Sequence, residues 1–353
     1  MAQATYDTFN SERLSKYAGS SRYSRRNLFS RVGLAKGNPF KYEAVKYIYA
    51  TSSIRVPEAF ILKPLPDDSW CRESNWMGYV AVATDEGKIT LGRRDILVAW
   101  RGTIEPIEWV KDLDFPLVSA SELVGRSGDN ANVHKGFLSI YTSYNQHSTF
   151  NKTSARDQVI SEVKKRVEQY KDEEISITVV GHSLGAALST LNAADIVSNG
   201  YNKPRNRPNK VCPVTAFIFG SPLVGDLNFK NTLQSMHDLH ILNLLNVPDV
   251  IPRLPPIGYS SVGVELWVDS RTSPYLNYPG DLLSWHNLEA AYLHPVALER
   301  GTTVKRDISL VNKNSAALKD KYSIPTNWWR EKNKGMVQMN NGSWILQDHE
   351  KDD

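Results

Sequence analysis

Two kinds of hydrophobic pattern alternate along most of the chain. Short apolar runs rich in β-branched residues are typical of buried strands, and apolar residues at helical spacing are typical of amphipathic helices. Strands are predicted at 76–84, 95–100, 175–180, 214–219, 240–247 and 263–269. Helices are predicted at 134–144, 184–194, 226–236 and 286–298. A further helix is predicted after an N-cap at Ser154, with Val159, Ile160, Val163 and Val167 on one face. Because strands and helices take turns, we expect an α/β fold whose mostly parallel sheet is covered on both faces.

The two ends of the chain and one turn have patterns of their own. Apolar residues at helical spacing in 42–50 predict a mostly helical N-terminal segment over 1–50. The turn signal at 85–87, followed by apolar residues at 89–91, predicts a hairpin with the strand before it. The pattern weakens in 300–353, which we expect to pack on the body as a C-terminal extension. Since no linker, repeat or second core interrupts the chain, residues 1–353 are expected to form one domain.

Composition narrows the class of protein. The 353 residues are 41% hydrophobic and 23% charged, as in an ordinary globular protein. No apolar run reaches the ~20 residues of a membrane span, and no secretory leader is visible, so we expect a cytoplasmic protein. With two cysteines, Cys71 and Cys212, reduced thiols are a simpler interpretation than one disulfide. No metal-ligand spacing or nucleic-acid motif occurs, so we expect no metal, no cofactor and no nucleic-acid partner.

The net charge is +4, which permits a weak preference for anionic lipid surfaces without establishing one. Part of the positive charge is concentrated near the N-terminus. We interpret this cluster as a solvated face, with a membrane-surface patch as the alternative. The cluster consists of Arg22, Arg25, Arg26 and Arg31.

A Gly-x-Ser-x-Gly sequence stands between a predicted strand and a predicted helix. Gly181 and Gly185 lack the Cβ atoms that would crowd a sharp turn, so Ser183 can hold its hydroxyl above the edge of the sheet. The helix that follows directs the positive end of its dipole toward the same point. This context favours a nucleophile over an ordinary Gly-Ser turn. His182, inside the motif, is expected to pack or to form hydrogen bonds rather than to react.

A serine nucleophile needs a base, and the base needs a carboxylate that orients it. In α/β-hydrolases the order along the chain is serine, acid, histidine. Asp249 follows an apolar strand and is the preferred acid, with Asp269 as the alternative and Asp226 as a helix cap. His286 is the preferred base and His294 the alternative. Chain order disfavours the remaining candidates, His134, His147, His237 and His240.

Two further features would complete such a site. Backbone amides of Leu184 and Thr103 are expected to form an oxyanion hole. The segment 104–111 has an apolar stripe with acidic residues on its other side. That stripe would pack on the core in an ordinary domain, or it could form a lid that lays its apolar face into lipid. The predicted lid residues are Ile104, Ile107, Trp109 and Val110.

Seven motifs together resemble the fungal-type (class III) lipases, and within that family the plant phospholipases A1 of the cytosolic class. The resemblance runs from about residue 3 to about residue 300. The motifs are Trp100-Arg101-Gly102-Thr103, Trp109-x-x-Asp112-Leu113, Val133-His134-x-Gly136-Phe137, Gly181-His182-Ser183-Leu184-Gly185-Ala186, Gly220-Ser221-Pro222, Asn246-x-x-Asp249-x-x-Pro252 and Trp285-His286-x-Leu288-Glu289-x-x-Leu293.

The resemblance implies an α/β-hydrolase fold and a triad of Ser183, Asp249 and His286. It also implies that Thr103 and Leu184 form the oxyanion hole and that 104–111 is the lid. The implied activity is calcium-independent hydrolysis of the sn-1 acyl ester of glycerolipids, by an enzyme that visits a membrane or droplet surface transiently. Relatives of this kind carry a tryptophan-rich segment before the motif that begins at Gln3, where this sequence starts, so an N-terminal truncation stays open.

Two other functions remain open. An esterase for soluble aryl or feruloyl esters would share the triad and differ in the lid. A non-catalytic lipase-like signalling module would use the fold to bind a partner, although such a module need not keep serine, acid and base together.

Overall fold

The computed structural model describes residues 1–12, 14–35, 37–54, 75–103, 116–125, 130–207, 209–273, 276, 280–293, 336–338, 344–346 and 348–351. One seven-stranded sheet organises them, with strand order β1-β2-β3-β6-β7-β8-β9. The strands are β1 (Tyr42–Ala50), β2 (Asn75–Ala83), β3 (Arg94–Trp100), β6 (Ile175–His182), β7 (Val214–Phe219), β8 (Leu239–Asn246) and β9 (Val264–Val268). The first three pair antiparallel, and β3, β6, β7, β8 and β9 are parallel.

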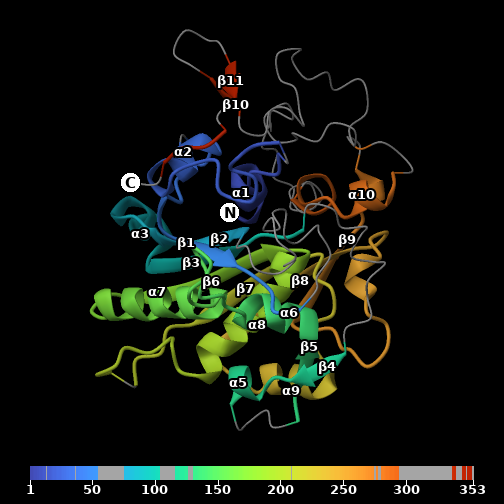
Figure 1. Cartoon of the computed structure of the whole chain (residues 1–353). Coiled ribbons are helices and arrows are strands. Elements are labelled where there is room, and N and C mark those ends of the chain that lie inside the picture. The colour runs from blue at the N-terminus through green and yellow to red at the C-terminus, as the bar shows by residue number, and fades with distance from the viewer. Residues whose placement is uncertain are drawn as a thin grey trace.

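Helices cover both faces of this sheet. Figure 1 shows α7 (Ala155–Gln169) and α8 (Leu184–Ser198) beneath it and α1 (Ala2–Thr8) and α2 (Leu28–Arg31) above it. The smaller helices are η1 (Arg25–Asn27), α3 (Asp85–Leu91), α5 (Ser121–Val124), α6 (Lys135–Thr142), α9 (Leu227–Gln234), η3 (Ile251–Arg253), η4 (Ser270–Thr272), α10 (Leu282–Trp285) and the π-helix η5 (Leu288–Leu293). Two further sheets have two strands each: β4 (Leu117–Ser119) pairs with β5 (Asn132–His134), and β10 (Met336–Gln338) pairs with β11 (Trp344–Leu346). The predicted α/β-hydrolase architecture, a mostly parallel sheet between helical layers, is confirmed.

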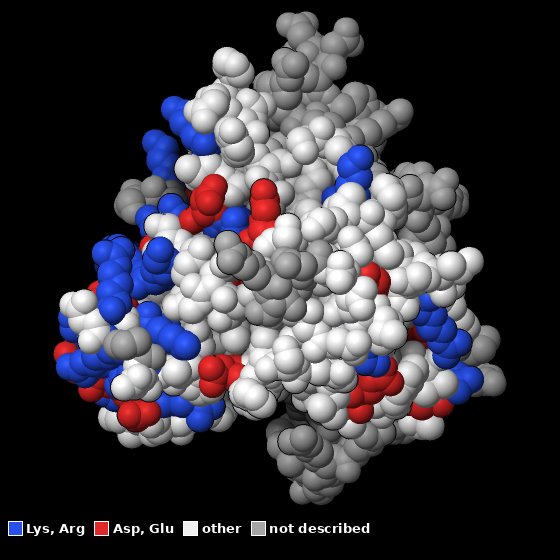
Figure 2. Space-filling model, turned by 90° about the horizontal axis from the view of Figure 1, so that it is seen from below, with Lys and Arg blue, Asp and Glu red and all other residues white. Residues whose placement is uncertain are grey.

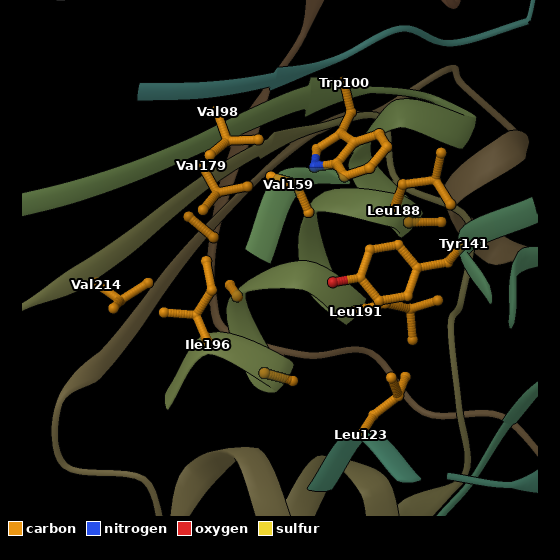
Figure 3. Packing of buried hydrophobic residues seen from close by; sticks show 14 of the residues in the cluster. Val98, Trp100, Leu123, Tyr141, Val159, Val179, Leu188, Leu191, Ile196 and Val214 are labelled. Atoms are coloured by element: carbon orange, nitrogen blue, oxygen red, sulfur yellow. The ribbon is translucent and has the colours of Figure 1, made fainter. Parts of the chain in front are cut away.

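The core has two halves, one on each face of the sheet, because neighbouring strand residues point to opposite faces. Val98 and Trp100 of β3 pack toward α8 in the larger half. Figure 3 shows the side chain of Trp100 near Leu188 of α8, and that of Val98 beside Val179 of β6. The other face of β3, together with residues of α2 and of η5, builds the second half. Since η5 begins two residues after His286, this packing holds the candidate base against the body of the protein.

The prediction of a helix over 42–50 is wrong, because this segment is the edge strand β1. Its register shifts twice, between Ala44 and Lys46 and between Ile48 and Tyr49. Each shift interrupts the alternation of inward and outward side chains, so the apolar residues fall at a spacing that imitates a helix. Gln158 of α7 accepts from the amide of Tyr49 (3.0 Å) beside the second shift.

The predicted hairpin after β2 is also wrong, although β2 and β3 are antiparallel neighbours. The connection is the helix α3, and Ile89 on it is 81% exposed rather than part of a strand. Thr84 caps α3 by accepting from the amide of Gly87 (3.1 Å). Gly92 ends it in the left-handed conformation (φ +72°). Thr84 and Gly92 are typical capping residues and indicate a helix, whereas Ile89 and Leu91 had suggested a strand.

The arginine cluster is not simply a solvated face, because two of its members meet the C-terminal segment. Arg31 pairs with Glu350 (2.6 Å), and Arg22 is buried with one guanidinium nitrogen 4.0 Å from Asp348. Of the expected C-terminal extension, 300–353, the structure describes β10, β11 and residues 348–351, and these contacts involve the last of the three.

A separate set of basic side chains, interspersed with acidic ones, gathers on the left of the view in Figure 2. On and after α7 the basic residues are Lys164, Lys165, Arg166, Lys171, Lys203, Arg205, Arg207 and Lys210. The segments that carry them, the end of α7 and 203–210, lead into the amino ends of β6 and β7. Within the described ranges, no helix has both the length and the apolar character needed to cross a bilayer.

Candidate active site

The turn between β6 and α8 gives Ser183 an uncommon backbone. Its φ is +58°, and it is the one residue other than glycine with positive φ in the part of the chain that the structure describes. Its amide donates to the carbonyl of Phe219 at the end of β7 (3.0 Å), which fixes the turn. A non-glycine residue in this region is strained, and such strain is concentrated at functional sites.

The two glycines of the motif are required by close contacts. A Cβ at Gly181 would lie 2.1 Å from the carbonyl oxygen of Gly185, and a Cβ at Gly185 would lie 2.3 Å from the carbonyl oxygen of Trp100. Both distances are far below contact distance, so only glycine lets β6, α8 and the end of β3 approach this closely. These contacts are the physical reason why Gly181 and Gly185 are needed at the turn, as the sequence predicted.

Asp249 and His286 lie side by side at the carboxyl ends of the parallel strands. Oδ2 of Asp249 is 2.6 Å from Nδ1 of His286, and Oδ1 accepts from the amide of Ile251 (2.9 Å). Both side chains are only 1% exposed. Nε2 of His286 is also buried and has no hydrogen-bond partner within the described residues, so it is the nitrogen available for a proton from another group.

The imidazole of His286 lies at the same corner as the turn at Ser183. Its ring centroid is 4.6 Å from that of His182, and its Cε1 would be 3.2 Å from a Cβ at Gly220. The residue before Gly220 is Phe219, whose carbonyl accepts from Ser183. No hydrogen bond joins Ser183 to His286 among the described contacts, and such bonds are commonly long before substrate binds. The structure thus brings the three predicted triad residues to one corner.

The predicted oxyanion-hole residues lie beside this turn. α8 begins at Leu184, whose amide, like those of every helix start, has no intrahelical acceptor. No side chain within the described ranges caps the helix there. Thr103 is 2% exposed, and its Oγ1 has no hydrogen-bond partner within the described residues. The strand end before it is held by the buried Arg101, which donates to the carbonyls of Trp76 (3.1 Å) and Gly102 (2.8 Å). Burial lowers the pKa of this guanidinium to about 10, which leaves it charged at neutral pH.

The structure also places the alternatives. Asp269 pairs with Arg271 (2.7 Å) on the surface, and Asp226 caps α9 through the amide of Phe229 (2.8 Å), as predicted for a cap. His134 caps α6 by accepting from the amide of Gly136 (3.1 Å). His147, His237 and His240 are exposed. His294 and the predicted lid at 104–111 lie outside the described residues.

Three side chains that the sequence analysis did not assign to the site contact it. The hydroxyl of Tyr6, from α1, is 2.7 Å from Nδ1 of His182. Asn246, at the end of β8, donates to the carbonyl of Trp285 (2.8 Å) and so fixes the backbone just before His286. Tyr292 of η5 donates its hydroxyl to Oδ2 of Asp249. Asn246 occurs in one of the seven quoted motifs and Tyr6 lies in the motif that begins at Gln3, so their place there was a signal; Tyr292 is not a named position of any motif.

Burial controls the protonation of the groups around the triad. It holds the pKa of His182 well below the ordinary value, with a smaller contribution from His286, so His182 is neutral. Burial and then the charge of Asp249 raise the pKa of Tyr292 well above its usual range, so this phenol remains a donor. No cluster of His, Cys, Asp and Glu in the described ranges is arranged to hold a metal ion.

Comparisons with known proteins identify the family of this chain. Residues 97–259 match the family model described as lipase (class 3). Phospholipase A1-IIgamma of Arabidopsis thaliana is 53% identical over 100% of this chain and 86% of its own length. The chain belongs to the class 3 lipase family. Phospholipase A1-II 1 of Oryza sativa subsp. indica is 51% identical over 100% of this chain and 89% of its own.

Solved structures of fungal lipases are also similar to this class 3 lipase chain. The triacylglyceride lipase of Rhizomucor miehei matches with 27% identity and a TM-score of 0.41, over 54% of this chain and 62% of its own. The LIP2 lipase of Yarrowia lipolytica matches with 19% identity and a TM-score of 0.49, over 76% of each chain.

Proposed function

We propose that this protein is a serine acylhydrolase that cleaves the sn-1 acyl ester of glycerolipids, namely phospholipids such as phosphatidylcholine, or mono- and diacylglycerols. One observation carries the proposal. A buried Asp249–His286 pair (2.6 Å) lies beside a strained serine at the start of α8. Membership of the class 3 lipase family supports an acyl ester as the substrate, and the names of the plant relatives support a phospholipid.

Each group has a defined role in the proposed reaction. His286 takes the proton of the Ser183 hydroxyl through Nε2, and the serine oxygen attacks the acyl carbonyl. Asp249 holds Nδ1 and stabilises the imidazolium that forms. The amides of Leu184 and Thr103 stabilise the tetrahedral oxyanion, with the Thr103 hydroxyl as a further donor. The lyso product leaves with the proton from His286, and a water activated by the same imidazole releases the fatty acid.

The proposed substrate is met at a membrane or droplet surface, by peripheral and transient contact. The site lies at the carboxyl ends of β6, β7 and β8, whereas the basic side chains gathered after α7 lie near the amino ends of β6 and β7 (Figure 2). We therefore propose that the lipid-facing surface is the end that carries His286, not the basic one. A cytoplasmic location is implied by the family resemblance and stays a prediction, which a fluorescent fusion in plant cells would test.

The decisive experiment replaces the nucleophile. We expect Ser183→Ala to lower the release of fatty acid from phosphatidylcholine and diacylglycerol vesicles about a thousandfold or more, because the covalent step is lost. Ser198→Ala, at the far end of α8, is the matched control and should retain full activity. A phospholipid with different acyl chains at its two positions, analysed by mass spectrometry of the lyso product, tests the sn-1 preference.

Other results would favour another function. An unchanged rate of release in Ser183→Ala would overturn the proposal. Turnover that does not rise when a short-chain substrate passes its micelle threshold would favour an esterase for soluble esters. Failure of a fluorophosphonate probe to label Ser183 in the wild-type protein would favour a binding module.

A further inference from the structure

The carboxylate of Asp249 receives three hydrogen bonds inside the protein. Oδ1 accepts from the amide of Ile251 (2.9 Å). Oδ2 accepts from Nδ1 of His286 (2.6 Å) and, in addition, from the hydroxyl of Tyr292. Asp249 is 2% exposed and Tyr292 is fully buried, so water does not compete for these positions. The base and the phenol therefore share one oxygen of the candidate acid.

The fold fixes where the phenol points. Tyr292 lies in η5, a π-helix that begins two residues after His286, and π-helical turns are frequent at functional sites. Its ring meets the ring of His182 edge-on, with centroids 5.8 Å apart. Its hydroxyl also lies close above Gly220, where a Cβ would be 2.7 Å away. The hydroxyl is thus held at Asp249 by packing on several sides.

We propose that Tyr292 is a positioning residue for the acylhydrolase function proposed above: its hydroxyl fixes Oδ2 of Asp249 against His286 and shares the negative charge of that oxygen. A buried carboxylate with fewer donors is a stronger acceptor. The phenol thereby limits how strongly Asp249 interacts with the imidazolium that forms on His286 when it takes the serine proton.

The other groups near the imidazole of His286 do not donate a side-chain hydrogen bond to Asp249 among the described contacts. His182, in the serine turn, faces His286 and is neutral. The hydroxyl of Tyr6 is hydrogen-bonded to Nδ1 of His182. Glu289, which is 9% exposed, is the other titratable side chain of η5. Among the described contacts, only Tyr292 and the amide of Ile251 join His286 as donors to Asp249.

The test is Tyr292→Phe, which removes the hydroxyl and keeps the ring. Without the second donor, protonated His286 is better stabilised. We expect the acidic limb of the kcat/KM profile, measured on a soluble p-nitrophenyl ester, to move up by about one pH unit. We also expect kcat to fall roughly tenfold while KM is unchanged, because Asp249 is less firmly placed.

The chain provides a matched control in Tyr141→Phe. Tyr141 is fully buried and donates its hydroxyl to Oδ2 of Asp195 (3.0 Å) in the core beneath the sheet, where Figure 3 shows it near Leu191. This variant loses the same kind of bond, so it should lose similar stability against urea. Its pH profile and kcat should be those of the wild type.

Equal pH profiles and equal kcat in the two tyrosine variants would overturn the proposal and leave Tyr292 a purely structural role. If Tyr292→Phe does not fold, replacing Tyr292 by meta-fluorotyrosine keeps the shape and makes the phenol a stronger donor. The acidic limb should then move down, and an unmoved limb would equally overturn the proposal. Ser183→Ala assayed in parallel separates the two hypotheses: if it is active, the proposed function fails, and if it is inactive, only the role of Tyr292 is in question.

Discussion

Gly220 is placed where the end of β7 passes beneath the candidate acid and base. Its φ is +54°, and its amide donates to the carbonyl of Leu244 (3.0 Å). A Cβ here would lie 2.7 Å from the hydroxyl of Tyr292 and 3.2 Å from Cε1 of His286. The position therefore has two reasons to be glycine, one in its backbone and one in its neighbours.

These two reasons can be separated by experiment. We expect Gly220→Ala to cost about 1 kcal/mol of stability from the backbone alone. It should also lower kcat/KM on lipid and soluble esters at least tenfold, because the methyl group displaces Tyr292 and His286. Gly200→Ala is the control, since Gly200 has φ +65° and no atom within 4 Å of its would-be Cβ. Gly200→Ala should show the stability loss alone; equal kinetics in the two variants would mean that crowding at Gly220 is harmless.

The candidate site shows what single residues reveal in a sequence and what they do not. Ser183 could be found because its glycines stand at fixed spacing between an apolar strand and an apolar helix. Asp249 and His286 could be ranked by chain order and by the strand before the acid. Tyr292 could not be found, because its role depends on a π-helix that turns its hydroxyl toward Asp249, and a local pattern does not specify that turn.

Helix α7 shows how local signals can specify an element fully. Ser154 accepts from the amide of Asp157 (3.0 Å), and the Asp157 carboxylate accepts from the amide of Ser154 (3.2 Å), which is a capping box. Val159, Val163 and Val167 are at most 1% exposed and form the buried face against the sheet. Cap and apolar stripe agree, so the predicted helix is confirmed.

The cap of α7 is accessible to a simple stability test. We expect Ser154→Ala to lower the free energy of unfolding by about 1 kcal/mol, because the amide of Asp157 loses its acceptor at the start of the helix and the Asp157 carboxylate loses the donor hydroxyl of Ser154. Ester hydrolysis at room temperature should be unchanged, since α7 lies at a distance from the site. Ser30→Ala, which removes an exposed hydroxyl, should stay within about 0.5 kcal/mol of the wild type. Urea unfolding measures both, and a Ser154→Ala midpoint equal to that of the control would contradict the role of the box.

Strand β1 and helix α3 show why other elements were predicted wrongly. The strand is stabilised by its pairing with β2, by its bulges and by Gln158, none of which is local in sequence. The helix α3 has only seven residues. Its two apolar residues, Ile89 and Leu91, stand at strand-like spacing and led to the prediction of a strand in spite of the capping residues. Edge strands and short helices depend most on their surroundings, so the antiparallel edge of the sheet was harder to predict than its parallel centre.

The two ends of the chain meet across the upper layer of the fold. Asp348 accepts from Asn10 (2.8 Å) and Ser15 (2.8 Å), and the ring of His349 stacks on Tyr17 with centroids 4.2 Å apart. Figure 1 shows the C-terminal end of the chain beside α2. The same N-terminal region begins with α1, whose Tyr6 contacts His182 beside the candidate nucleophile. The C-terminal residues therefore stabilise a segment that reaches the site.

Glu350 is the main charged link in this contact. Its carboxylate accepts from Asn27 (3.1 Å), from the amide of Ser24 (3.2 Å) and from Arg31 (2.7 Å). Burial opposes its charge, but these donors outweigh burial and hold its pKa below the ordinary value. A carboxylate whose pKa is lowered by folding stabilises the native state above its unfolded pKa of about 4.3. That contribution is lost as the pH falls through the lower, folded value.

Glu350→Gln should therefore destabilise the protein in a pH-dependent way. At pH 7 we expect a loss of about 1–2 kcal/mol against urea, since an amide is a weaker acceptor for Arg31 and the other donors. The difference from the wild type should shrink below about pH 4, where Glu350 itself becomes protonated. Glu86→Gln is the matched control, because Glu86 pairs with Lys41 (2.7 Å) on the surface with 71% of its side chain exposed, and such pairs contribute little. A Glu350→Gln difference that stays constant from pH 7 to pH 3 would show that its shape, and not its charge, holds the two ends of the chain together.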